Sequence, residues 1–283
     1  MNYRHAFHAG NFADVLKHAV LVALLESLVQ KKAPLCYVDT HAGAGRYDLG
    51  GAEAQKTQEH VAGIAKLLAA PRLPPALHVY MNLVRALNAK AGHADLLEYP
   101  GSPLLASLLL RESDRLVLCE VQDAERASLE LTFAGDRRVQ VMQRDGYAAL
   151  KALLPPKERR GLVLIDPPFE NQSDEFDVVK EALKPAFKRW ATGVYAVWYP
   201  IKLRQQVNPF HRWLTSCGMS KILVAELLLH PDNSALRLNG CGMAVINAPW
   251  KLDTTLNAMM PVLANLLAAG RYGSHSVHWL VHE

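Results

Sequence analysis

One strand-like stretch, Gly161 to Ile165, limits the fold more than any other part of the chain. It reads Gly-Leu-Val-Leu-Ile, and a short continuous apolar run is typical of a strand buried on both faces of a parallel sheet. Asp166, Pro167 and Pro168 follow at once, and prolines cannot continue a central strand. The chain must therefore leave the sheet at the carboxyl end of this strand, where open α/β sheets bind their ligands.

The turn formed by Asp166, Pro167, Pro168 and Phe169 suits a nucleobase that carries an exocyclic amine. Such an amine is a poor nucleophile because its lone pair is delocalised into the ring. The Asp166 carboxylate and the Pro167 carbonyl can accept both N–H protons, and the two prolines hold that carbonyl in place. Phe169 offers a flat face for a flipped-out base. The alternative is a strand-ending turn with a buried Phe, but the complete motif favours the functional interpretation.

Three other apolar strand patterns also end at an acidic residue. They cover residues 35–39, 115–120 and 139–142, and their acids are Asp39, Glu120 and Asp145. A helical pattern follows each strand, and the carboxyl ends of parallel strands meet at one edge of a sheet. The sequence therefore predicts an α/β fold with a mostly parallel, twisted sheet, helices on both faces, and four acids along one edge.

The glycine loop after the first strand restricts the ligand. Gly43 and Gly45 allow a tight turn and a close approach to a ligand, but Asp48 occupies the third glycine position of the dinucleotide fingerprint. This argues against a nicotinamide dehydrogenase, whose pyrophosphate binds at the helix N-terminus. Asp39, four residues before Gly43, suits a ligand with a charged amino group and no phosphate, such as S-adenosylmethionine. His41 lies beside the glycines and is assigned to the same ligand.

Three further positions have two interpretations each. Glu120 is suited to ribose hydroxyls or faces solvent. Asp145, with Gly146, either receives the adenine amino group or caps the helix from Tyr147. Ser102 precedes Pro103 at a helix start, so it caps the helix or faces the ligand.

The distance between the first two strands predicts an insertion. Glu120 follows Gly43 by 77 residues, whereas the ribose-binding acid of a dinucleotide fold comes ~20 residues after the loop. Helical patterns fill residues 53–91, with a proline-rich break at 71–75. We predict a helical insertion over residues 50–98 within one domain of residues 1–283. Near the C-terminus, residues 221–229 and 242–246 predict a closing antiparallel hairpin.

The first twelve residues form an aromatic and basic arm that includes Tyr3, Arg4 and His5. Such a segment can stack on bases and contact phosphates, or it can pack onto the body of the protein through its aromatic rings. Both interpretations stay open. From Ala13 to Gln30 the apolar spacing predicts a helix that carries His18, and a lone His at such a position is usually a surface or packed side chain.

Composition excludes several classes of protein. The net charge of +4 is compatible with a nucleic-acid partner, and the four cysteines contain no CxxC pair, which indicates reduced thiols in a cytoplasmic protein. There is no secretory signal, and no apolar run is long enough to span a bilayer. The histidines near the C-terminus have no partner set for a metal. The basic pairs Arg137-Arg138, Arg159-Arg160 and Lys188-Arg189 can contact phosphates, although such pairs are more often only solvated.

Taken together, the strand–glycine loop, the acids at successive strand tips and the Asp166–Phe169 turn resemble the class I S-adenosylmethionine-dependent methyltransferases. Among these the turn resembles the amino-methyltransferases with a D/N-PP-Y/F motif. The string from Tyr3 to His18, followed by residues 39–47, is similar to the bacterial 23S rRNA adenine-N6-methyltransferase family. The resemblance extends over essentially the whole chain. The chain departs from the family at Phe169, where the family commonly has Tyr, and at Phe12, which replaces a more polar residue.

The resemblance implies a role for each matching position. The residues expected to line the S-adenosylmethionine pocket are His18, His41, Ser102, Glu120, Asp145, Gly146 and Asp166. Asp166, with Pro167 and Phe169, is also expected to engage the target adenine. Tyr3 is expected near the RNA, and Arg4 and His5 are assigned to the RNA with it.

The function implied is direct methyl transfer from S-adenosylmethionine to N6 of one adenine of 23S rRNA, in a Rossmann-like domain, with the base flipped against the turn. The substrate is expected to be protein-free or early-assembly 23S rRNA, and the protein a cytoplasmic monomer without metal or membrane. Three alternatives stay open. They are methylation of guanine N2, methylation of DNA adenine by the same fold, and a non-catalytic RNA-binding or assembly protein.

Overall fold

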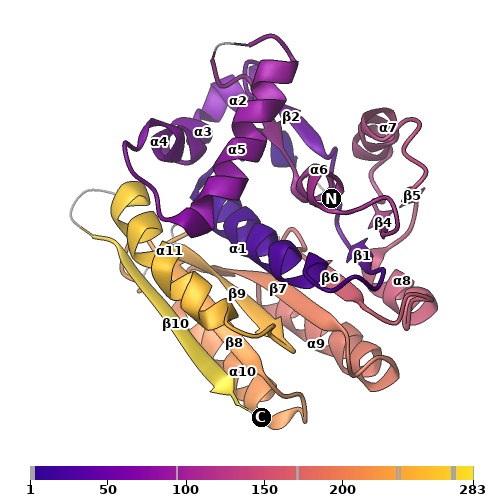
Figure 1. The fold of residues 1–283 in the computed structure, drawn as a ribbon. Helices are drawn as coiled ribbons and strands as arrows, with labels where there is room; N and C mark the ends of the chain where they lie inside the picture. Colours follow the sequence, from indigo (N-terminus) through magenta and orange to yellow (C-terminus); the bar gives the residue numbers. More distant parts are fainter. Residues whose placement is uncertain are drawn as a thin grey trace.

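The centre of the fold is an eight-stranded sheet (Figure 1). The computed structural model describes residues 4–93, 95–169, 172–233, 235, 237–268 and 272–282, and the sheet has the order β10-β8-β9-β7-β6-β1-β4-β5. Its parallel strands are β1 (Cys36–Asp39), β4 (Arg115–Cys119), β5 (Val139–Met142), β6 (Gly161–Ile165) and β7 (Val194–Ile201). The antiparallel strands are β8 (Ile222–Leu228), β9 (Gly240–Ile246) and β10 (Ser274–Val281). The predicted mostly parallel sheet and its closing hairpin are confirmed.

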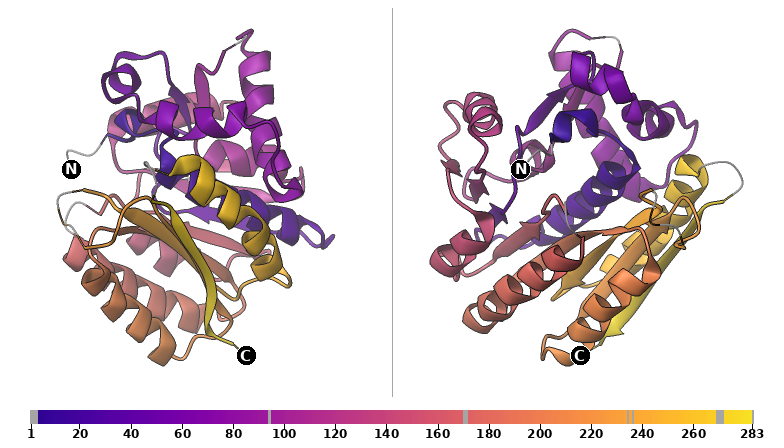
Figure 2. Two further views of the ribbon diagram at one scale, coloured as in Figure 1. Left: turned by 90° about the vertical axis from the view of Figure 1, so that its left-hand side faces the viewer. Right: turned by 180° about the vertical axis from the view of Figure 1, so that it is seen from behind.

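Helices cover both faces of this sheet (Figure 2). One face packs against α1 (Phe12–Val29), α6 (Ser102–Leu109), α7 (Asp123–Thr132) and α11 (Leu252–Leu267). The other packs against α8 (Gly146–Leu153), α9 (Gln172–Arg189) and α10 (Arg204–Ser216). Alternate residues of one strand enter different cores: Leu162 and Leu164 face the first, Val163 and Ile165 the second. This two-sided burial explains the continuous apolar run in β6.

The region between β1 and α6 is helical, as the sequence predicted, but the part before the proline-rich break forms three short helices instead of one. The helices are α2 (Ala52–Thr57), α3 (Glu59–Ala62), α4 (Ile64–Ala69) and α5 (Pro75–Lys90). An antiparallel ribbon that the sequence did not predict brackets them, because β2 (Arg46–Asp48) pairs with β3 (Glu98–Pro100). Strands of three residues are too short to show a periodic pattern. The ribbon places the two ends of the insertion side by side next to the glycine loop.

The described part of the N-terminal arm packs against the insertion and α1. Residues His5–Phe7 form a short 3-10 helix, and Asn11 caps α1 by accepting hydrogen bonds from the first turn. The insertion contacts the arm through Glu59, whose carboxylate binds Nδ1 of His8 at 3.0 Å. Gly63 lies so close to the carbonyl of Gly10 that a Cβ at this position would collide with it. The insertion therefore fixes the path of the arm toward the carboxyl edge of the sheet.

Candidate active site

A cavity of about 380 Å³ opens at the carboxyl ends of the parallel strands, next to the arm and α1. It lies where the chain connections change direction between β1 and β6, which is the usual ligand site of an open α/β sheet. All the residues that the family resemblance assigns to the cofactor pocket line it: His18, His41, Ser102, Glu120, Asp145, Gly146 and Asp166. Pro167, Phe169 and His5 also line it. The structure thus brings residues from distant parts of the chain around one space.

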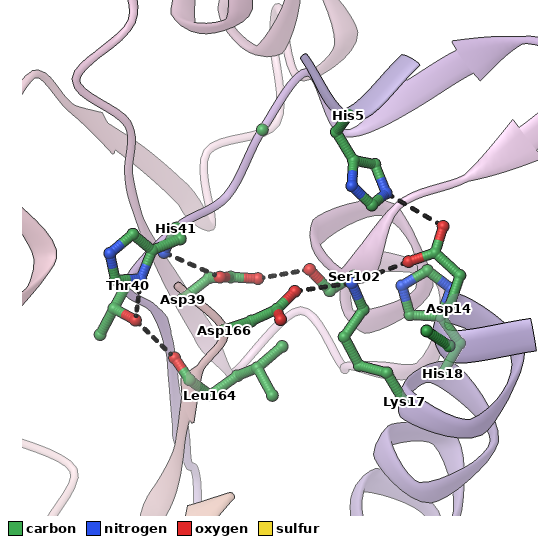
Figure 3. A network of polar contacts seen from close by, with 12 residues as sticks. His5, Asp14, Lys17, His18, Asp39, Thr40, His41, Ser102, Leu164 and Asp166 are labelled. Carbon is green, nitrogen blue, oxygen red and sulfur yellow. Dashed lines mark hydrogen bonds and ion pairs between the residues drawn. The ribbon is translucent and has the colours of Figure 1, made fainter. Parts of the chain in front are cut away.

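A buried lysine joins the arm to the tip of β6 (Figure 3). Nζ of Lys17 lies 2.6 Å from Oδ2 of Asp166 and 2.8 Å from Oδ1 of Asp14. The other oxygen of Asp14 binds Nε2 of His5 at 3.0 Å and accepts a hydrogen bond from the backbone N–H of Gly10 at 2.9 Å. One continuous chain of polar contacts therefore runs from the arm through α1 to Asp166.

The charges in this chain are mutually stabilised. Burial by itself would lower the pKa of Lys17, but Asp14 and Asp166 hold it well above its usual range. Burial would likewise raise the pKa of Asp14, but His5 and Lys17 hold it well below its usual range. Lys17 therefore stays a cation in a site from which water is largely excluded, and it fixes one oxygen of Asp166. The other oxygen of Asp166 remains an acceptor at the cavity.

Asp39 lies beneath the glycine loop and does not line the cavity. Its carboxylate accepts hydrogen bonds from the hydroxyls of Tyr37 and Ser102, each at 2.7 Å, and from the backbone N–H of His41 at 3.3 Å. Burial raises the pKa of Asp39 to about 6, although the hydroxyl donors act in the opposite direction. The expected direct contact of this acid with a ligand amine is replaced by a supporting role, in which Asp39 positions Ser102 and the loop.

Ser102 is not a helix cap. The N-cap of α6 is Gly101, and the Ser102 hydroxyl donates to Asp39 instead. Asp145 does cap α8, because its Oδ1 accepts from the backbone N–H of Ala148 at 2.8 Å, and it lines the cavity as well. The two interpretations of Asp145 are therefore compatible.

Glu120 contacts the glycine loop directly. Its Oε2 accepts from the backbone N–H of Gly43 at 2.8 Å, and its Oε1 accepts from the N–H of Gln122 at 2.8 Å. Each carboxylate oxygen can accept a second hydrogen bond, so these contacts orient Glu120 without exhausting its capacity. Gly43 has a φ of +60°, and a Cβ there would collide with the Tyr47 hydroxyl. The loop thus needs glycine at this point for both reasons.

Two of the cavity histidines, His18 and His41, are neutral at physiological pH. Burial lowers the pKa of His18 to about 3 and that of His41 to about 4. Nδ1 of His18 hydrogen-bonds the Tyr99 hydroxyl at 2.7 Å, while its buried Nε2 has no partner within the described residues. A buried polar atom normally has a partner, so this nitrogen at the cavity wall is available to a ligand.

The turn after β6 holds Phe169 in an unusual conformation. Its φ is +44°, in the left-handed region that bulky residues rarely adopt, and its side chain is buried. The ring packs edge-to-face against Phe176 and Trp198, with centroids 5.2 and 5.8 Å away. It still lines the cavity, as does Trp198. The Phe169 ring therefore both packs in the core and faces the cavity, so the two interpretations of this residue are compatible.

The arm residues assigned to RNA have different positions. Tyr3 lies outside the described residues. Arg4 is exposed, and its guanidinium binds the Glu53 carboxylate at 2.6 Å. His5 lines the cavity, and its ring packs at a tilt of 58° against that of Tyr47, with centroids 4.9 Å apart.

Sequence reasoning missed Asp14, Lys17 and Trp198 as cavity residues. A signal existed for the first two, because an acid and a lysine three residues apart share one helix face. Within the described residues, no cluster of three or more His, Cys, Asp or Glu side chains is placed to hold a metal ion. None of the described helices combines the length and apolar character needed to cross a membrane.

Comparison with known proteins identifies close relatives. A family model for ribosomal RNA large subunit methyltransferase D, RlmJ, matches residues 32–281. The chain is 45% identical to ribosomal RNA large subunit methyltransferase J of Escherichia coli and 44% identical to the protein of the same name from Haemophilus influenzae, in each case over the full length of both chains. A crystal structure of a Legionella pneumophila protein is similar with a TM-score of 0.88 and 35% identity, and the match covers 96% of this chain and 98% of that one.

Replacing Lys17 by Met should destabilise the protein strongly. The variant leaves Asp14 and Asp166 as buried carboxylates without their cation, and breaking such a pair costs about 3–5 kcal/mol. The free energy of unfolding measured by urea denaturation at pH 7 checks this. Lys180→Met, which breaks a more exposed pair with Asp177, should cost less than about 1 kcal/mol. Equal losses of stability in the two variants would show that Lys17 is not needed to neutralise Asp14 and Asp166. Adding Asp14→Asn should partly restore the free energy of unfolding of the Lys17→Met variant.

Replacing Asp39 by Asn should change how stability depends on pH. The folded protein holds the Asp39 proton up to about pH 6, whereas the unfolded chain releases it near 3.8. Between these values the folded state binds more protons, so this group's contribution to the free energy of unfolding falls as pH rises, by up to about 3 kcal/mol. In denaturation experiments from pH 4 to 7, the free energy of unfolding of the variant relative to that of the wild type should rise up to about pH 6 and stay constant above it. A pH-independent difference between the two proteins would refute this assignment.

Proposed function

The chain belongs to the ribosomal RNA large subunit methyltransferase family, and from this premise we propose that it transfers a methyl group from S-adenosylmethionine to N6 of one adenine in 23S rRNA. The observation that carries the proposal is the position of Asp166 and Pro167, at the tip of β6 and at the wall of a cavity that all the expected cofactor residues line. The substrate is 23S rRNA, free or early in assembly, and the protein acts as a monomer.

The residues present fit S-adenosylmethionine. The cavity offers neutral His18, whose Nε2 has no partner among the residues described, a glycine loop with no room for a Cβ at Gly43, and the Glu120 carboxylate for ribose hydroxyls. His41, Asp145 with Gly146, and Ser102 complete this set. When bound, the cofactor supplies an electrophilic methyl group on a sulfonium.

Asp166 and Pro167 prepare the amine for attack. Lys17 binds Oδ2 of Asp166 and holds the carboxylate in place, and the remaining acceptor capacity of Asp166 and the Pro167 carbonyl accept the two N–H protons of the amine. Because Lys17 is itself held by Asp14, the carboxylate is oriented before the substrate arrives. Preorganised acceptors of this kind cost no reorganisation during the reaction. Adenine N6 is supported by the similarity of the string from Tyr3 to His18, followed by residues 39–47, to the 23S rRNA adenine-N6-methyltransferases.

Phe169 supplies the surface for the flipped base. Its ring is fixed by Phe176 and Trp198, so little side-chain entropy is lost when a base stacks on it. Stacking of a base on an aromatic ring contributes about 1–3 kcal/mol.

The test is transfer from labelled S-adenosylmethionine to protein-free ribosomal RNA taken from cells that lack this protein, followed by digestion to nucleosides. Label in N6-methyladenosine is the expected result. Label in N2-methylguanosine would overturn the choice of base and keep the fold and mechanism. Preferential labelling of competing DNA would overturn the choice of nucleic acid, and cofactor binding without transfer to either would favour the non-catalytic alternative.

Replacing Asp166 by Asn should abolish most of the transfer while the protein stays folded. Asn keeps the shape but loses the charge that the amine requires, and the loss of one preorganised electrostatic group typically costs about 100-fold or more in turnover. Single-turnover methylation of 23S rRNA checks this, with the free energy of unfolding as the measure of an intact fold. Asp177→Asn, an exposed acid on α9, is the matched control and should be fully active. An Asp166→Asn variant with near-normal turnover would refute the assigned role.

Replacing Phe169 by Leu should reduce turnover on RNA by about 10- to 100-fold, the equivalent of one lost stacking interaction. Leu keeps an apolar group against Phe176 and Trp198, so cofactor affinity should change by less than about threefold. Phe169→Tyr keeps the ring and should retain activity. Equal losses of cofactor affinity and RNA turnover in the Leu variant would show that the ring only packs.

A further inference from the structure

The edge of the sheet opposite the cavity carries an excess of positive charge. Basic residues precede or begin each of the five parallel strands, in segments 31–34, 111–115, 136–138, 157–160 and 188–189. These segments contain eleven Lys or Arg and four Asp or Glu, a net charge of +7. Because the whole chain carries only +4, everything outside them is net negative. We call the basic side chains of these segments the amino-edge row.

The row is continuous in space although its segments are far apart in sequence. The strand order β7-β6-β1-β4-β5 places the segments side by side, and strands ~4.8 Å apart give a row about 19 Å long. Direct contacts join neighbouring segments. Arg160 and Arg111 both donate to the carbonyl oxygen of Ala33, and Arg115 binds Glu158 at 2.9 Å. A surface hollow lined by Pro34, Arg115, Arg137 and Lys157 lies within the row.

Much of this charge is not neutralised inside the protein. Three arginines of the row pair with acids of the same segments: Arg111 with Asp114, Arg115 with Glu158, and Arg138 with Asp136. Arg160 donates only to backbone carbonyls, which leaves its charge uncompensated. Among the residues that the structure describes, the exposed members without an ion pair or side-chain hydrogen bond are Lys31, Lys32, Arg137, Lys157, Arg159 and Lys188. Their ammonium and guanidinium groups are available to a ligand.

Helix dipoles account for only part of the row. The helices that precede the parallel strands end at this edge, and a cation in the last turn of a helix gains about 0.3–1 kcal/mol. This explains Lys188, which lies in the last turn of α9. Arg137, Lys157 and Arg159 lie beyond the ends of α7 and α8, where the effect has faded. Arg159 also has a φ of +57°, a backbone conformation that favours glycine, so local backbone preference does not account for an arginine at this position either.

We infer that the amino-edge row is a second contact surface for the phosphate backbone of the rRNA substrate, separate from the cavity. The inference rests on the proposed function, because the proposed function identifies rRNA as the substrate. Five residues of β6 separate the row from Asp166 by at least about 17 Å. A short RNA that fills the cavity therefore ends before the row, whereas a long folded rRNA reaches both edges. Phosphate contacts of this kind add affinity that depends on salt but not on sequence.

The test compares a long and a short RNA. The triple variant Arg137→Gln, Lys157→Gln, Arg159→Gln removes three exposed charges that form no ion pair or side-chain hydrogen bond within the described part of the chain. With full-length 23S rRNA at 0.15 M salt we expect KM to rise about 10-fold, kcat to stay unchanged, and the salt dependence of binding to weaken by up to about two counterions. With the shortest fragment that the wild type still methylates, no change is expected. The matched control Arg72→Gln, Arg85→Gln, Lys90→Gln makes the same change of charge at exposed residues of the helical insertion, away from this edge of the sheet, and should match the wild type on both RNAs.

Two results would overturn the inference. One is an unchanged KM and an unchanged salt dependence of binding on full-length rRNA. If the triple variant in addition binds an assembly particle more weakly, the row contacts a protein of that particle and not the RNA. The other is an equal loss on the short fragment, which would place the row within reach of the cavity. Equilibrium binding of rRNA without cofactor separates this inference from the proposed function. A wild type that binds rRNA through the row but transfers no methyl group would refute the proposed function and leave the row standing.

Discussion

The contact of Lys17 with Asp14 and Asp166 holds together three parts of the protein that the chain does not connect locally. Lys17 and Asp14 lie on α1, Asp166 lies 149 residues later at the tip of β6, and Asp14 also fixes the arm through His5. A buried ion pair of this kind adds little to stability compared with an apolar core, but a cation between two carboxylates permits only one arrangement. The position of the turn after β6, the first turn of α1 and the path of the arm therefore depend on one another.

The parallel sheet explains why the two functions proposed for this protein lie at opposite edges. All five parallel strands point in one direction, so acids at their carboxyl ends gather around the cavity and cations before their amino ends form the amino-edge row. Helix N-termini approach the first edge and helix C-termini the second, which adds partial charges of the appropriate sign to each. The methyl-transfer chemistry uses the narrow, enclosed edge. The open, charged edge suits a backbone that is recognised without regard to sequence.

The insertion and the arm work as one unit beside this frame. Glu59 binds both His8 and Asn11, and the backbone of Ile64 donates to Gly10, so the arm is docked before any substrate is present. The ribbon of β2 and β3 ties the insertion to the glycine loop at its base. This arrangement gives the helical insertion a physical purpose, which is to place the arm over the cavity.

The sequence by itself determined the parallel strands that end at an acid, the closing hairpin and many of the residues of the cavity wall, but not the ribbon of β2 and β3 or the places of Asp14, Lys17 and Trp198. Each of the predicted features follows from local patterns: apolar runs for buried strands, glycines at a tight loop, and an acid at each strand tip. Only the tertiary structure decided which side chains meet. The sequence predicted that Asp39 contacts the ligand. In the structure Asp39 is buried under the loop and accepts hydrogen bonds from Ser102 and Tyr37 instead. Lys17 became part of the site because folding brought β6 against α1, and a charge taken out of water must find its partner nearby, however distant that partner is in sequence.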